Sequence, residues 1–472
     1  MARIAMIGAG SLVFAKTLMM DILATPGLED STIVLMNRTE PKLRRIEAFA
    51  NDVVKENNLS AKIEATLDRR QALDGADFVV NMIQVGGVEA FKYDYEIPLK
   101  YGVDQCIGDT IGPGGIFRAL RSIPVLMDMA EDQLELCPDA TMLNYVNPMS
   151  MCCYALGTVE GLKFVGLCHG VQTTLDLIAG YSEVPKEEID FLCAGTNHMG
   201  WFLELYHEGR DLYPDLRAKF ELPEYYVNEK VRGEVFRHFG YFMTESTGHL
   251  SEYVPWFRKN RKALDLYCDM PDFGGASGAY YKYCEMIANK FANINPLERE
   301  SKQLAPRSAE YCSHIIEAIA LDRPFKFNGN VRNDGYITNL PWGSCVEVPV
   351  YADRMGLHPL VVGDLPPQCA AMNMSNVQVH GLAVEAALTG DVERAAQAVA
   401  MDPLTAAVCT LHETREMTRE LLKAQEQWLP QFEPDSLKPL PILSIPADVV
   451  PAEVPLDPAL AIANRFGELA KD

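Results

Sequence analysis

The chain begins with a short apolar run, a glycine turn and an apolar helical segment, and this order constrains the fold more than any other feature. Residues 3–7 have the composition of a buried strand, Gly8-Ala9-Gly10-Ser11 that of a tight turn, and residues 12–23 that of a helix. Glycines at such a turn let backbone N–H groups approach an anionic ligand closely. The pattern is typical of the first strand and helix of a doubly wound sheet.

Further apolar segments alternate with helical segments, as in a parallel sheet. Strands are predicted at residues 31–36, 77–83, 140–145 and 164–167, and a helix is predicted to start near Pro41. Polar pairs follow the last two of these strands, Asn147-Pro148 and Cys168-His169. Because ligands bind beyond the carboxyl ends of the strands in such sheets, these residues are well placed for a site.

From about residue 195 the pattern changes to aromatic-rich and longer irregular segments. We therefore predict an α/β protein, with an N-terminal Rossmann-like domain over residues 1–194 and a mixed α+β domain with a helical C-terminal part over 195–472. In this second part, strands are predicted at 335–337 and 345–349, helices at 379–388, 392–400 and 404–427, and an irregular proline-rich segment at 430–458.

Composition narrows the class of ligand. The formal net charge of −23 repels phosphate backbones and anionic lipid, so we expect small molecules as partners rather than nucleic acid or membranes. The twelve cysteines lack the dense spacing of a secreted disulfide scaffold, which favours a reducing cytoplasm. The chain also starts directly in a strand, without a signal-peptide pattern, and no apolar segment has transmembrane length.

Cys168 and His198 are candidate metal ligands. A thiolate and a neutral imidazole both bind divalent transition metals, but a structural zinc site normally has four protein ligands. With only two, the remaining positions would be open to substrate oxygens. The alternative is a buried inert cysteine and a structural histidine.

Several other polar residues are candidates for roles in a site. The glycine-dense segment 108–115 is either a flexible connector or a loop that approaches a ligand, with Asp109 offering a carboxylate to a sugar hydroxyl or to a metal. His169, Glu245, His249 and Tyr253 lie near polar motifs, and each could act as an acid or base if its pKa is displaced towards neutrality.

The turn Gly8-Ala9-Gly10-Ser11, called the nucleotide turn below, departs from the full dinucleotide-binding pattern. Val13 stands at the third glycine position, and Asn37-Arg38, rather than an acidic residue, follow the second strand. The choice between NAD and NADP is therefore open from these residues.

An ordered set of motifs along the chain resembles glycoside hydrolase family 4, and further motifs resemble its α-galactosidase (melibiase) branch. The family motifs are Gly8-Ala9-Gly10-Ser11, Gly112-Pro113-Gly114-Gly115, Asn147-Pro148-Met149, Cys168-His169-Gly170-Val171, Gly195-Thr196-Asn197-His198, Asn330-Val331-Arg332-Asn333-Asp334-Gly335 and Asn339-Leu340-Pro341. The branch motifs are the segments 240–246, 252–257 and 402–407.

The resemblance implies a glycosidase that depends on NAD and a divalent metal, usually manganese, with an architecture like that of lactate and malate dehydrogenases; this family is an exception to the paired-carboxylate mechanism. It implies oxidation at sugar carbon 3, loss of the carbon 2 proton, elimination of the leaving group and addition of water. The residue roles that it implies are metal binding by Cys168 and His198, cofactor binding by Gly8, Ala9, Gly10, Ser11, Asn37 and Gln84, substrate binding by Asn147, Asp109 and Arg332, and catalysis by His169 as acid, Glu245 or Tyr253 as base, and Asp109.

The sugar is less constrained than the mechanism. Gly170 stands where melibiase-type members often carry serine, so an α-glucosidase, an α-glucuronidase or galacturonidase, or an enzyme for rarer hexosides is the alternative within the family. The absence of the phospho-sugar pattern favours an unphosphorylated glycoside. From other classes, a malate-dehydrogenase-like oxidoreductase and a non-enzymatic NAD-sensing module remain alternatives. The resemblance also implies a homodimer or homotetramer.

Overall fold

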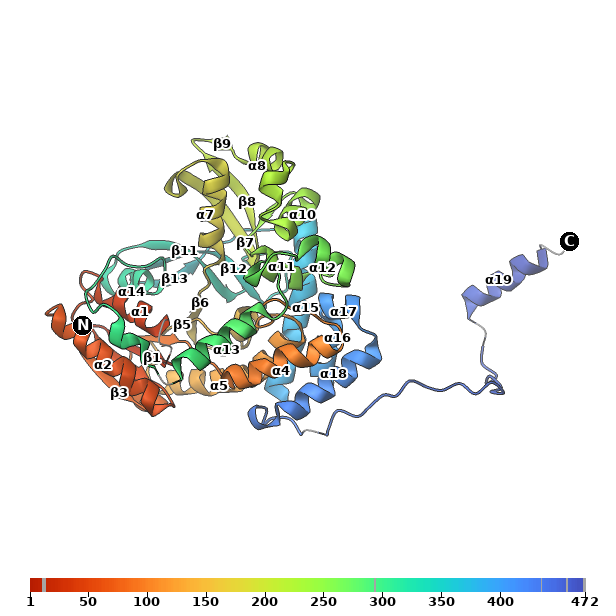
Figure 1. Cartoon of the computed structure of the whole chain (residues 1–472), viewed down its shortest axis with the longest axis horizontal. Helices are drawn as coiled ribbons and strands as arrows, with labels where there is room; N and C mark the ends of the chain where they lie inside the picture. Colours follow the sequence, from red (N-terminus) through yellow and green to blue (C-terminus); the bar gives the residue numbers. More distant parts are fainter. Residues whose placement is uncertain (11–13, 293, 434, 456, 470–472) are drawn as a thin grey trace. The chain divides into compact units, whose positions relative to one another are not determined.

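The computed structural model describes residues 1–10, 14–292, 294–433, 435–455 and 457–469, so the predicted cofactor residue Ser11 lies outside the described residues. The chain forms two compact units, Met1–Lys438 and Pro439–Asp472. The second unit contains one described helix, α19 (Pro458–Leu469), and the other elements labelled in Figure 1 belong to the first.

The amino-terminal strands form the parallel part of a large sheet. Across the sheet they run in the order β3, β2, β1, β4, β5, β6, and neighbouring strands are parallel. This is the strand order of a dinucleotide-binding sheet, and it confirms the predicted Rossmann-like α/β fold. The strands are β1 (Arg3–Ile7), β2 (Thr32–Met36), β3 (Lys62–Thr66), β4 (Phe78–Asn81), β5 (Thr141–Asn144) and β6 (Lys163–Gly166).

Antiparallel strands from the second half of the chain extend the same sheet. β11 joins β6 where Asn330 pairs with Gly166, and β12 joins β7 where Glu347 pairs with Gly195. These strands, with β13 on β12 and β9 on β8, are β7 (Ile189–Thr196), β8 (Met199–His207), β9 (Arg210–Asp211), β10 (Phe242–Met243), β11 (Phe325–Arg332), β12 (Cys345–Asp353) and β13 (Gly356–Pro359). Described strands from both sides of residue 194 thus share one sheet, and the division into two domains there stays a prediction.

Alternation along the parallel strands produces two hydrophobic cores, one on each face of the sheet. Ile4 and Met6 of β1 belong to the larger cluster, whereas Ala5 and Ile7 belong to the other. Successive side chains of a strand point to opposite faces, so a sheet covered on both sides needs apolar residues at every position. The continuous apolar run in β1 meets that requirement.

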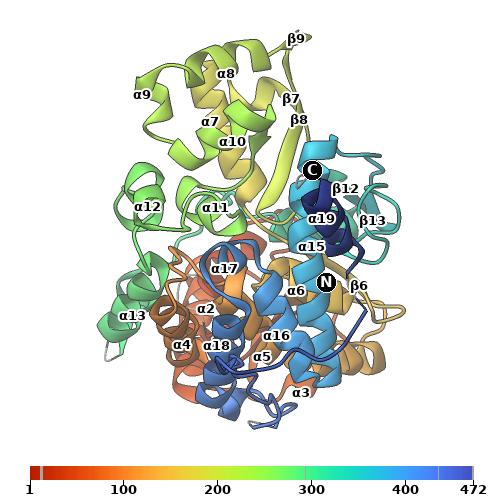
Figure 2. The same ribbon diagram turned by 90° about the vertical axis from the view of Figure 1, so that its right-hand side faces the viewer.

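Helices cover both faces of the sheet, because α1 and α2 contribute to the larger apolar cluster and α3 contributes to the other. Figure 2 shows α15 and α16 side by side. α15 packs along α5, α6 and α16 in the first unit. The helices of this unit are α1 (Phe14–Leu23), α2 (Glu40–Glu56), α3 (Arg69–Leu73), α4 (Gly87–Lys100), α5 (Gly112–Leu136), α6 (Met149–Leu156), α7 (Gly170–Ser182), α8 (Tyr213–Phe220), α9 (Pro223–Tyr226), α10 (Lys230–Phe239), α11 (Thr247–Tyr253), α12 (Arg261–Tyr267), α13 (Ala279–Phe291), α14 (Cys312–Leu321), α15 (Pro367–Thr389), α16 (Val392–Met401), α17 (Pro403–Val408) and α18 (Leu411–Ala424).

Two predictions for the second half were wrong. Residues 335–337 form a loop, and β12 pairs instead with β11. The Asn333 side chain accepts from the Ile337 N–H and donates to carbonyls of the same loop, and Gly335 has a φ of +92°, which a strand does not contain. The helix predicted at 404–427 is divided into α17 and α18, because Thr410 and Glu413 form a capping box that starts a new helix.

The twelve cysteines are free thiols, as their spacing predicted. Among the described residues, no helix combines the length and the apolar character that a membrane span requires.

A buried ion pair that joins α4 to α5 supplies a test of stability. Arg121 donates to Asp94 at 2.6 Å, and the two side chains are 1% and 0% exposed. Asp94→Asn removes the negative charge and leaves a buried guanidinium, so we expect the free energy of unfolding to fall by about 3 kcal/mol in urea titrations. Asp265→Asn, at the exposed Arg261–Asp265 pair, is the control and should change stability little. Equal effects of the two variants would contradict the prediction.

Candidate active site and metal centre

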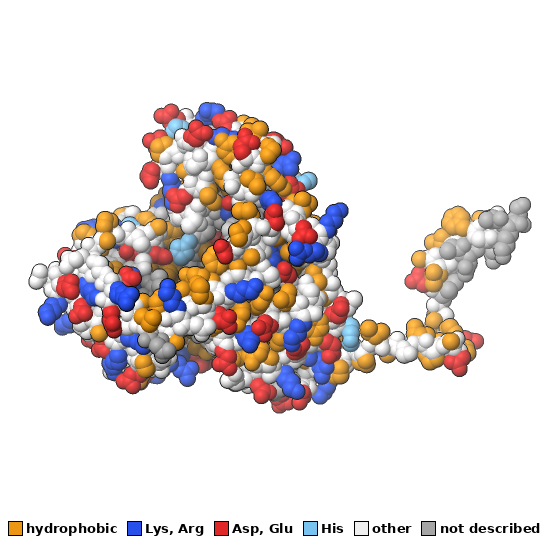
Figure 3. Space-filling view, in the orientation of Figure 1, with side chains coloured by type: hydrophobic (Ala, Val, Ile, Leu, Met, Phe, Trp, Pro, Cys, Tyr) orange, Lys and Arg blue, Asp and Glu red, His pale blue; other side chains and the backbone are white. Residues whose placement is uncertain are grey.

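Most of the candidate residues lie at one edge of the sheet, beyond the carboxyl ends of the parallel strands. Gly8 follows β1, Asn37 follows β2, Asn147 lies shortly after β5, and Cys168 lies shortly after β6. The face of the molecule shown in Figure 3 is hollowed near its middle, with a histidine side chain at the rim. Chain topology alone therefore gathers residues that are remote in sequence.

The nucleotide turn is tightly packed against two neighbouring strands. Gly8 has a φ of +88°, and a Cβ there would lie 2.8 Å from the Met82 carbonyl oxygen. A Cβ on Gly10 would lie 1.6 Å from the Asn37 side-chain nitrogen. Only glycine leaves this edge open to a ligand, and Gln84, exposed just beyond β4, lies beside it.

Cys168 and His198 meet although they come from different parts of the sheet. Cys168 follows β6, and His198 lies at the tip of the turn between β7 and β8 with a φ of +64°. The Cys168 Sγ and the His198 Nε2 are 3.3 Å apart. A thiol and an imidazole nitrogen therefore face the same point, as the sequence predicted for a pair of ligands.

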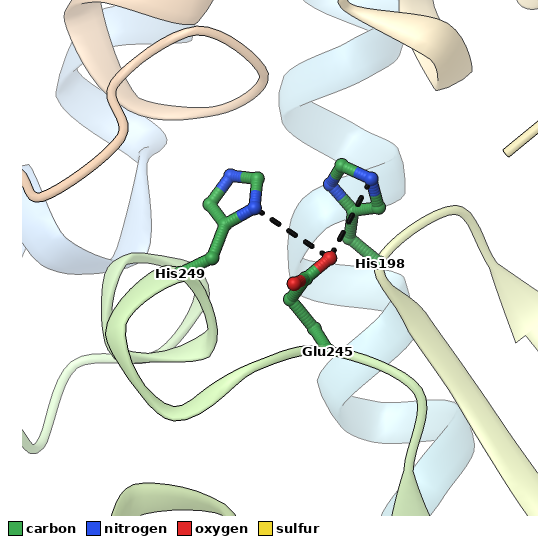
Figure 4. Close-up of side chains that lie close together, drawn as sticks. All are labelled: His198, Glu245 and His249. Atoms are coloured by element: carbon green, nitrogen blue, oxygen red, sulfur yellow. Dashed lines mark ion pairs between the residues drawn. The ribbon is translucent and has the colours of Figure 1, made fainter. Parts of the chain in front are cut away.

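Glu245 and His249 complete a cluster of possible ligands around His198. The Glu245 Oε2 lies 3.5 Å from the His198 Nε2 and 3.5 Å from the His249 Nδ1, and its carboxylate points between the two imidazoles (Figure 4). One ligand atom from each of these three residues lies within 4.8 Å of the others. With Cys168 alongside, the cluster offers sulfur, nitrogen and oxygen donors to a divalent transition metal.

A short chain of hydrogen bonds runs behind these groups. The Tyr253 hydroxyl lies 3.0 Å from the His198 Nδ1 and donates to the Thr110 Oγ1 at 2.6 Å. The Thr110 hydroxyl in turn lies 2.7 Å from the His249 Nε2. Tyr253 is thus connected through Thr110 to His249, and His249 lies next to Glu245.

The loop that carries Thr110 is fixed by a buried carboxylate. Glu252 accepts from the backbone N–H groups of Ile107 at 2.6 Å and Gly108 at 2.9 Å. Gly115, at the start of α5, packs directly on Thr110, because a Cβ there would lie 2.5 Å from the Thr110 carbonyl carbon. The glycine-dense segment is therefore an ordered part of the site and not a flexible connector.

Asp109 and Asn147 form a second polar group with Arg118 of α5. The Arg118 Nη1 donates to the Asp109 Oδ2 at 3.2 Å, and its Nε donates to the Asn147 carbonyl oxygen at 3.1 Å. The Asn147 amide donates to the same Asp109 oxygen at 3.4 Å. Three groups that can bind sugar hydroxyls are thus held together.

Burial and charge displace the pKa values of the metal-binding candidates. Burial raises the pKa of the Cys168 thiol to about 11, and the carboxylates of Glu347 and Glu245 add to this rise. Burial alone would raise the pKa of Glu245, but His198 and His249 lower it well below its usual range. Glu245 is therefore anionic near neutral pH, whereas Cys168 keeps its proton until a cation displaces it.

His169 occupies a more open position. Its Nε2 bonds to the Glu310 carboxylate, and this hydrogen bond raises the pKa of His169. The His169 side chain is 49% exposed. It lies next to Cys168 in the chain, so a protonated imidazole would stand at the edge of the candidate metal centre.

Arg332 lies away from these groups. In β11, Asn330 pairs with Gly166, and Arg332 lies two residues further along, towards the amino end of the antiparallel β6. Its guanidinium donates to the Gly157 carbonyl oxygen and pairs with Asp334. The structure therefore does not bring Arg332 together with Cys168 and His198.

Arg118, Thr110 and Glu347 are site residues to which the sequence analysis assigned no role. Glu347 is 2% exposed, and burial raises its pKa to about 7. The sequence could have indicated Glu347, because a glutamate interrupts the otherwise apolar strand predicted at 345–349. Arg118 and Thr110 carry no such signal, because only the packing of α5 against the loop gives them their partners.

Family models match both parts of the chain. The model described as family 4 glycosyl hydrolase matches residues 3–184, and the model of its C-terminal domain matches residues 193–405. An α-galactosidase from Rhizobium meliloti (strain 1021) is 42% identical over 438 residues, covering 91% of this chain and 89% of the relative. An α-galactosidase from Bacillus subtilis (strain 168) is 39% identical, covering 92% of this chain and 100% of the relative.

Solved structures share the fold. A 6-phospho-β-glucosidase from Thermotoga maritima, solved with manganese, NAD⁺ and glucose 6-phosphate, is similar with a TM-score of 0.73 at 21% identity, covering 90% of this chain and 99% of that one. A 6-phospho-α-glucosidase from gut microorganisms, solved with NAD and Mn²⁺, has a TM-score of 0.73 at 20% identity and covers 91% of this chain and 99% of its own.

The raised pKa of Glu347 predicts a pH dependence of stability in the metal-free protein. Its folded pKa of about 7 exceeds the ordinary value of 4.5, so between these pH values only the folded state holds the proton. Loss of this proton lowers the free energy of unfolding by up to about 3 kcal/mol as pH rises through that range. Glutamine at position 347 does not titrate. Urea titrations in chelator should therefore show the free energy of unfolding of Glu347→Gln rising relative to that of the wild type from pH 4.5 to 7. A difference that does not vary with pH would contradict this.

Proposed function

The chain belongs to family 4 of the glycosyl hydrolases, and from this premise we propose that it hydrolyses unphosphorylated α-galactosides. The observation that carries the proposal is the meeting of Cys168 and His198 beside the Glu245 carboxylate and the Asp109–Asn147 pair, in a chain 42% and 39% identical to two α-galactosidases.

The donor set fits a divalent transition metal, and we propose manganese. Cys168 and His198 would be ligands, and the anionic Glu245 lies within reach of the same point. Thiolate, imidazole and carboxylate together suit borderline metals better than Mg²⁺ or Ca²⁺. The two similar solved structures that contain manganese have the same fold.

The turn after β1 fits a dinucleotide, and we propose NAD. Gly8 and Gly10 leave the space that side chains would fill, and α1 follows the turn. Asn37 lies where an acidic residue commonly contacts the ribose, and its amide can also bond to ribose hydroxyls. Gln84 stands at the same edge.

The bound groups would supply the redox and Lewis-acid chemistry: NAD would accept and return the hydride at carbon 3, and the metal would polarise the carbon 3 oxygen. The residues of the chain would orient the sugar and move its protons. Asn147 and Asp109, held by Arg118, would bind the sugar hydroxyls.

We propose Tyr253 as the base that removes the carbon 2 proton. Burial raises the pKa of Tyr253 well above its usual value, so the free protein holds this hydroxyl protonated. A divalent cation beside His198 would favour the phenolate, and the Thr110 hydroxyl at 2.6 Å would stabilise it. Glu245, whose pKa is lowered, is a weak base and fits metal binding better. These positions and pKa shifts support Tyr253 over Glu245 as the proposed base.

His169 is our proposed acid. The hydrogen bond to Glu310 raises the pKa of His169, which favours the protonated imidazole that an acid requires. After elimination of the leaving group, the same side chain could hold the water that adds to the sugar. Its partial exposure fits a group that faces the leaving group rather than the buried sugar.

Gly170 is compatible with an α-galactosidase. A Cβ at this position would lie 3.5 Å from the Thr244 carbonyl oxygen and 3.8 Å from the Cys168 Sγ, which are ordinary contact distances. Packing therefore does not require glycine here, and a serine at this position would need no change of the backbone. The departure from the melibiase motif leaves the shape of the site intact.

We also propose a cytoplasmic location and a homodimer or homotetramer. The free state of the twelve cysteines suits a reducing compartment.

The function is tested with nitrophenyl α-glycosides of several sugars, assayed with and without NAD, Mn²⁺ and a thiol reductant. We expect cleavage of the α-galactoside only when both cofactors are present, and a loss of at least about 100-fold for Cys168→Ser and His198→Ala. Cys193→Ser, a buried thiol outside the ligand cluster, is the control variant. Full activity of the Cys168 variant in chelating buffer would overturn the proposal. Preference for another sugar would assign the enzyme to another substrate class of the same family.

The base is tested by Tyr253→Phe and Glu245→Gln. Tyr253→Phe should lower kcat by about 10²- to 10⁴-fold, because it removes the proton acceptor, and should weaken Mn²⁺ binding less than Glu245→Gln does, because the Tyr253 hydroxyl contacts only the Nδ1 of His198. Glu245→Gln should instead weaken Mn²⁺ binding, measured by titration calorimetry. A Glu245 variant with normal metal affinity and no turnover would reverse these assignments.

A further inference from the structure

The short segment that precedes α13 is fixed against two parts of the candidate site. The Tyr280 N–H donates to the Cys106 carbonyl at 3.1 Å, and the Gly278 N–H donates to that of Gln105 at 2.8 Å. These residues belong to the loop that carries Asp109. Further back, Phe273 in the turn Asp272–Gly274 abuts α11, since a Cβ on Gly248 would lie 2.0 Å from the Phe273 carbonyl oxygen. Gly248 directly precedes His249.

Aromatic rings form a continuous series from the interior to the surface along this segment. The Arg118 guanidinium lies 5.9 Å from the centroid of the Phe91 ring, and the Phe91 ring lies 5.6 Å from that of Tyr280. Tyr280 is 6.2 Å from Phe273, and Phe273 is 5.6 Å from Tyr283. The first member, Arg118, pairs with Asp109 in the site.

Exposure rises along this series. Phe91 is completely buried, Tyr280 is partly buried, and Phe273 and Tyr283 are 43% and 46% exposed. Half-exposed aromatic rings that lie next to one another offer an apolar surface on which a ligand can stack. In Figure 3 hydrophobic side chains gather beside the hollow, over the position of α13 in Figure 1.

We propose that Phe273, Tyr280 and Tyr283 form a binding platform for the leaving group of the substrate, and that this leaving group is a second sugar ring. The proposal rests on the proposed function and extends it from the galactosyl part to its partner. A pyranose has an apolar C–H face that stacks on an aromatic ring and hydroxyls that remain in water, so a half-exposed platform suits it. The series starts at Arg118, which pairs with Asp109, and ends at the half-exposed rings of Phe273 and Tyr283, where a second ring could stack.

The surroundings of the platform supply polar partners for such a ring. The exposed Asp272 carboxylate adjoins Phe273 and can accept from sugar hydroxyls. The Tyr283 side chain carries a hydroxyl at the exposed end. A small number of polar groups beside apolar rings is the usual composition of a ligand site.

The platform is tested by comparing two substrates that differ only in the leaving group. Methyl α-galactoside has no second ring, whereas an α-1,6-linked galactosyl-glucose does. Phe273→Ala and Tyr283→Ala should each lower kcat/KM for the disaccharide about fivefold, in line with the loss of one aromatic contact, and leave kcat/KM for the methyl glycoside within about twofold of the wild type. Phe273→Trp should retain disaccharide activity.

Tyr206→Ala is the matched control, because Tyr206 is a 39% exposed aromatic residue in β8, and it should change neither substrate. Equal losses on both substrates, or no loss on the disaccharide in either alanine variant, would overturn the platform. A lower molecular mass of the variants in light scattering would overturn it too and identify an interface between copies of the chain.

Cleavage of methyl α-galactoside by the wild type tests the proposed function independently. If the wild type cleaves the methyl glycoside of another sugar, the α-galactosidase proposal fails, and the platform is tested with the methyl glycoside and disaccharide of that sugar.

Discussion

Two single-residue junctions in the sheet hold together the segments that carry the candidate metal ligands Cys168 and His198. Asn330 of β11 pairs with Gly166 of β6, and Glu347 of β12 pairs with Gly195 of β7. The Asn330 amide also donates to the Gly166 carbonyl at 3.3 Å and to the Glu347 Oε1 at 3.5 Å. Both junctions lie just before the segments that carry the ligands, because Cys168 follows Gly166 and His198 follows Gly195. The parallel and antiparallel parts of the sheet are thereby joined beside the candidate site.

The same region contains three ionisable side chains whose pKa values are displaced from their usual ranges. Glu347 is buried and Cys168 is half-buried, and both have raised pKa values, whereas Glu245 is kept anionic by two imidazoles. Burial in low dielectric favours the neutral forms of the first two groups. A divalent cation reverses this preference, because it stabilises the thiolate that binds it and the carboxylates nearby. On the proposed function, metal binding would therefore release protons from groups that the folded chain holds neutral.

The sequence predicted the parts of the fold and site that depend on local patterns. The buried run of β1, the glycines that follow it and the polar residues after β5 and β6 are each specified by neighbours within one strand and turn. The pairing of Cys168 with His198 was predictable because both are strong ligand types beside turns. β11 was missed because its segment is rich in polar residues such as Asn328 and Asn330, which are buried only through side-chain hydrogen bonds to other strands. The roles of Arg118, Thr110 and Tyr280 could not be predicted from the sequence either, because their partners come from remote segments of the chain.

The position of Glu347 has a consequence for how the site arises during synthesis. The nucleotide turn, Cys168 and His198 are all translated before β12, yet the sheet that fixes Cys168 and His198 opposite each other closes only when β11 and β12 insert between β6 and β7. A nascent chain that ends before residue 345 therefore carries both ligands without the strand that sets their spacing. On the proposed function, high-affinity metal binding would therefore belong to the completed chain, in which β11 and β12 separate β6 from β7.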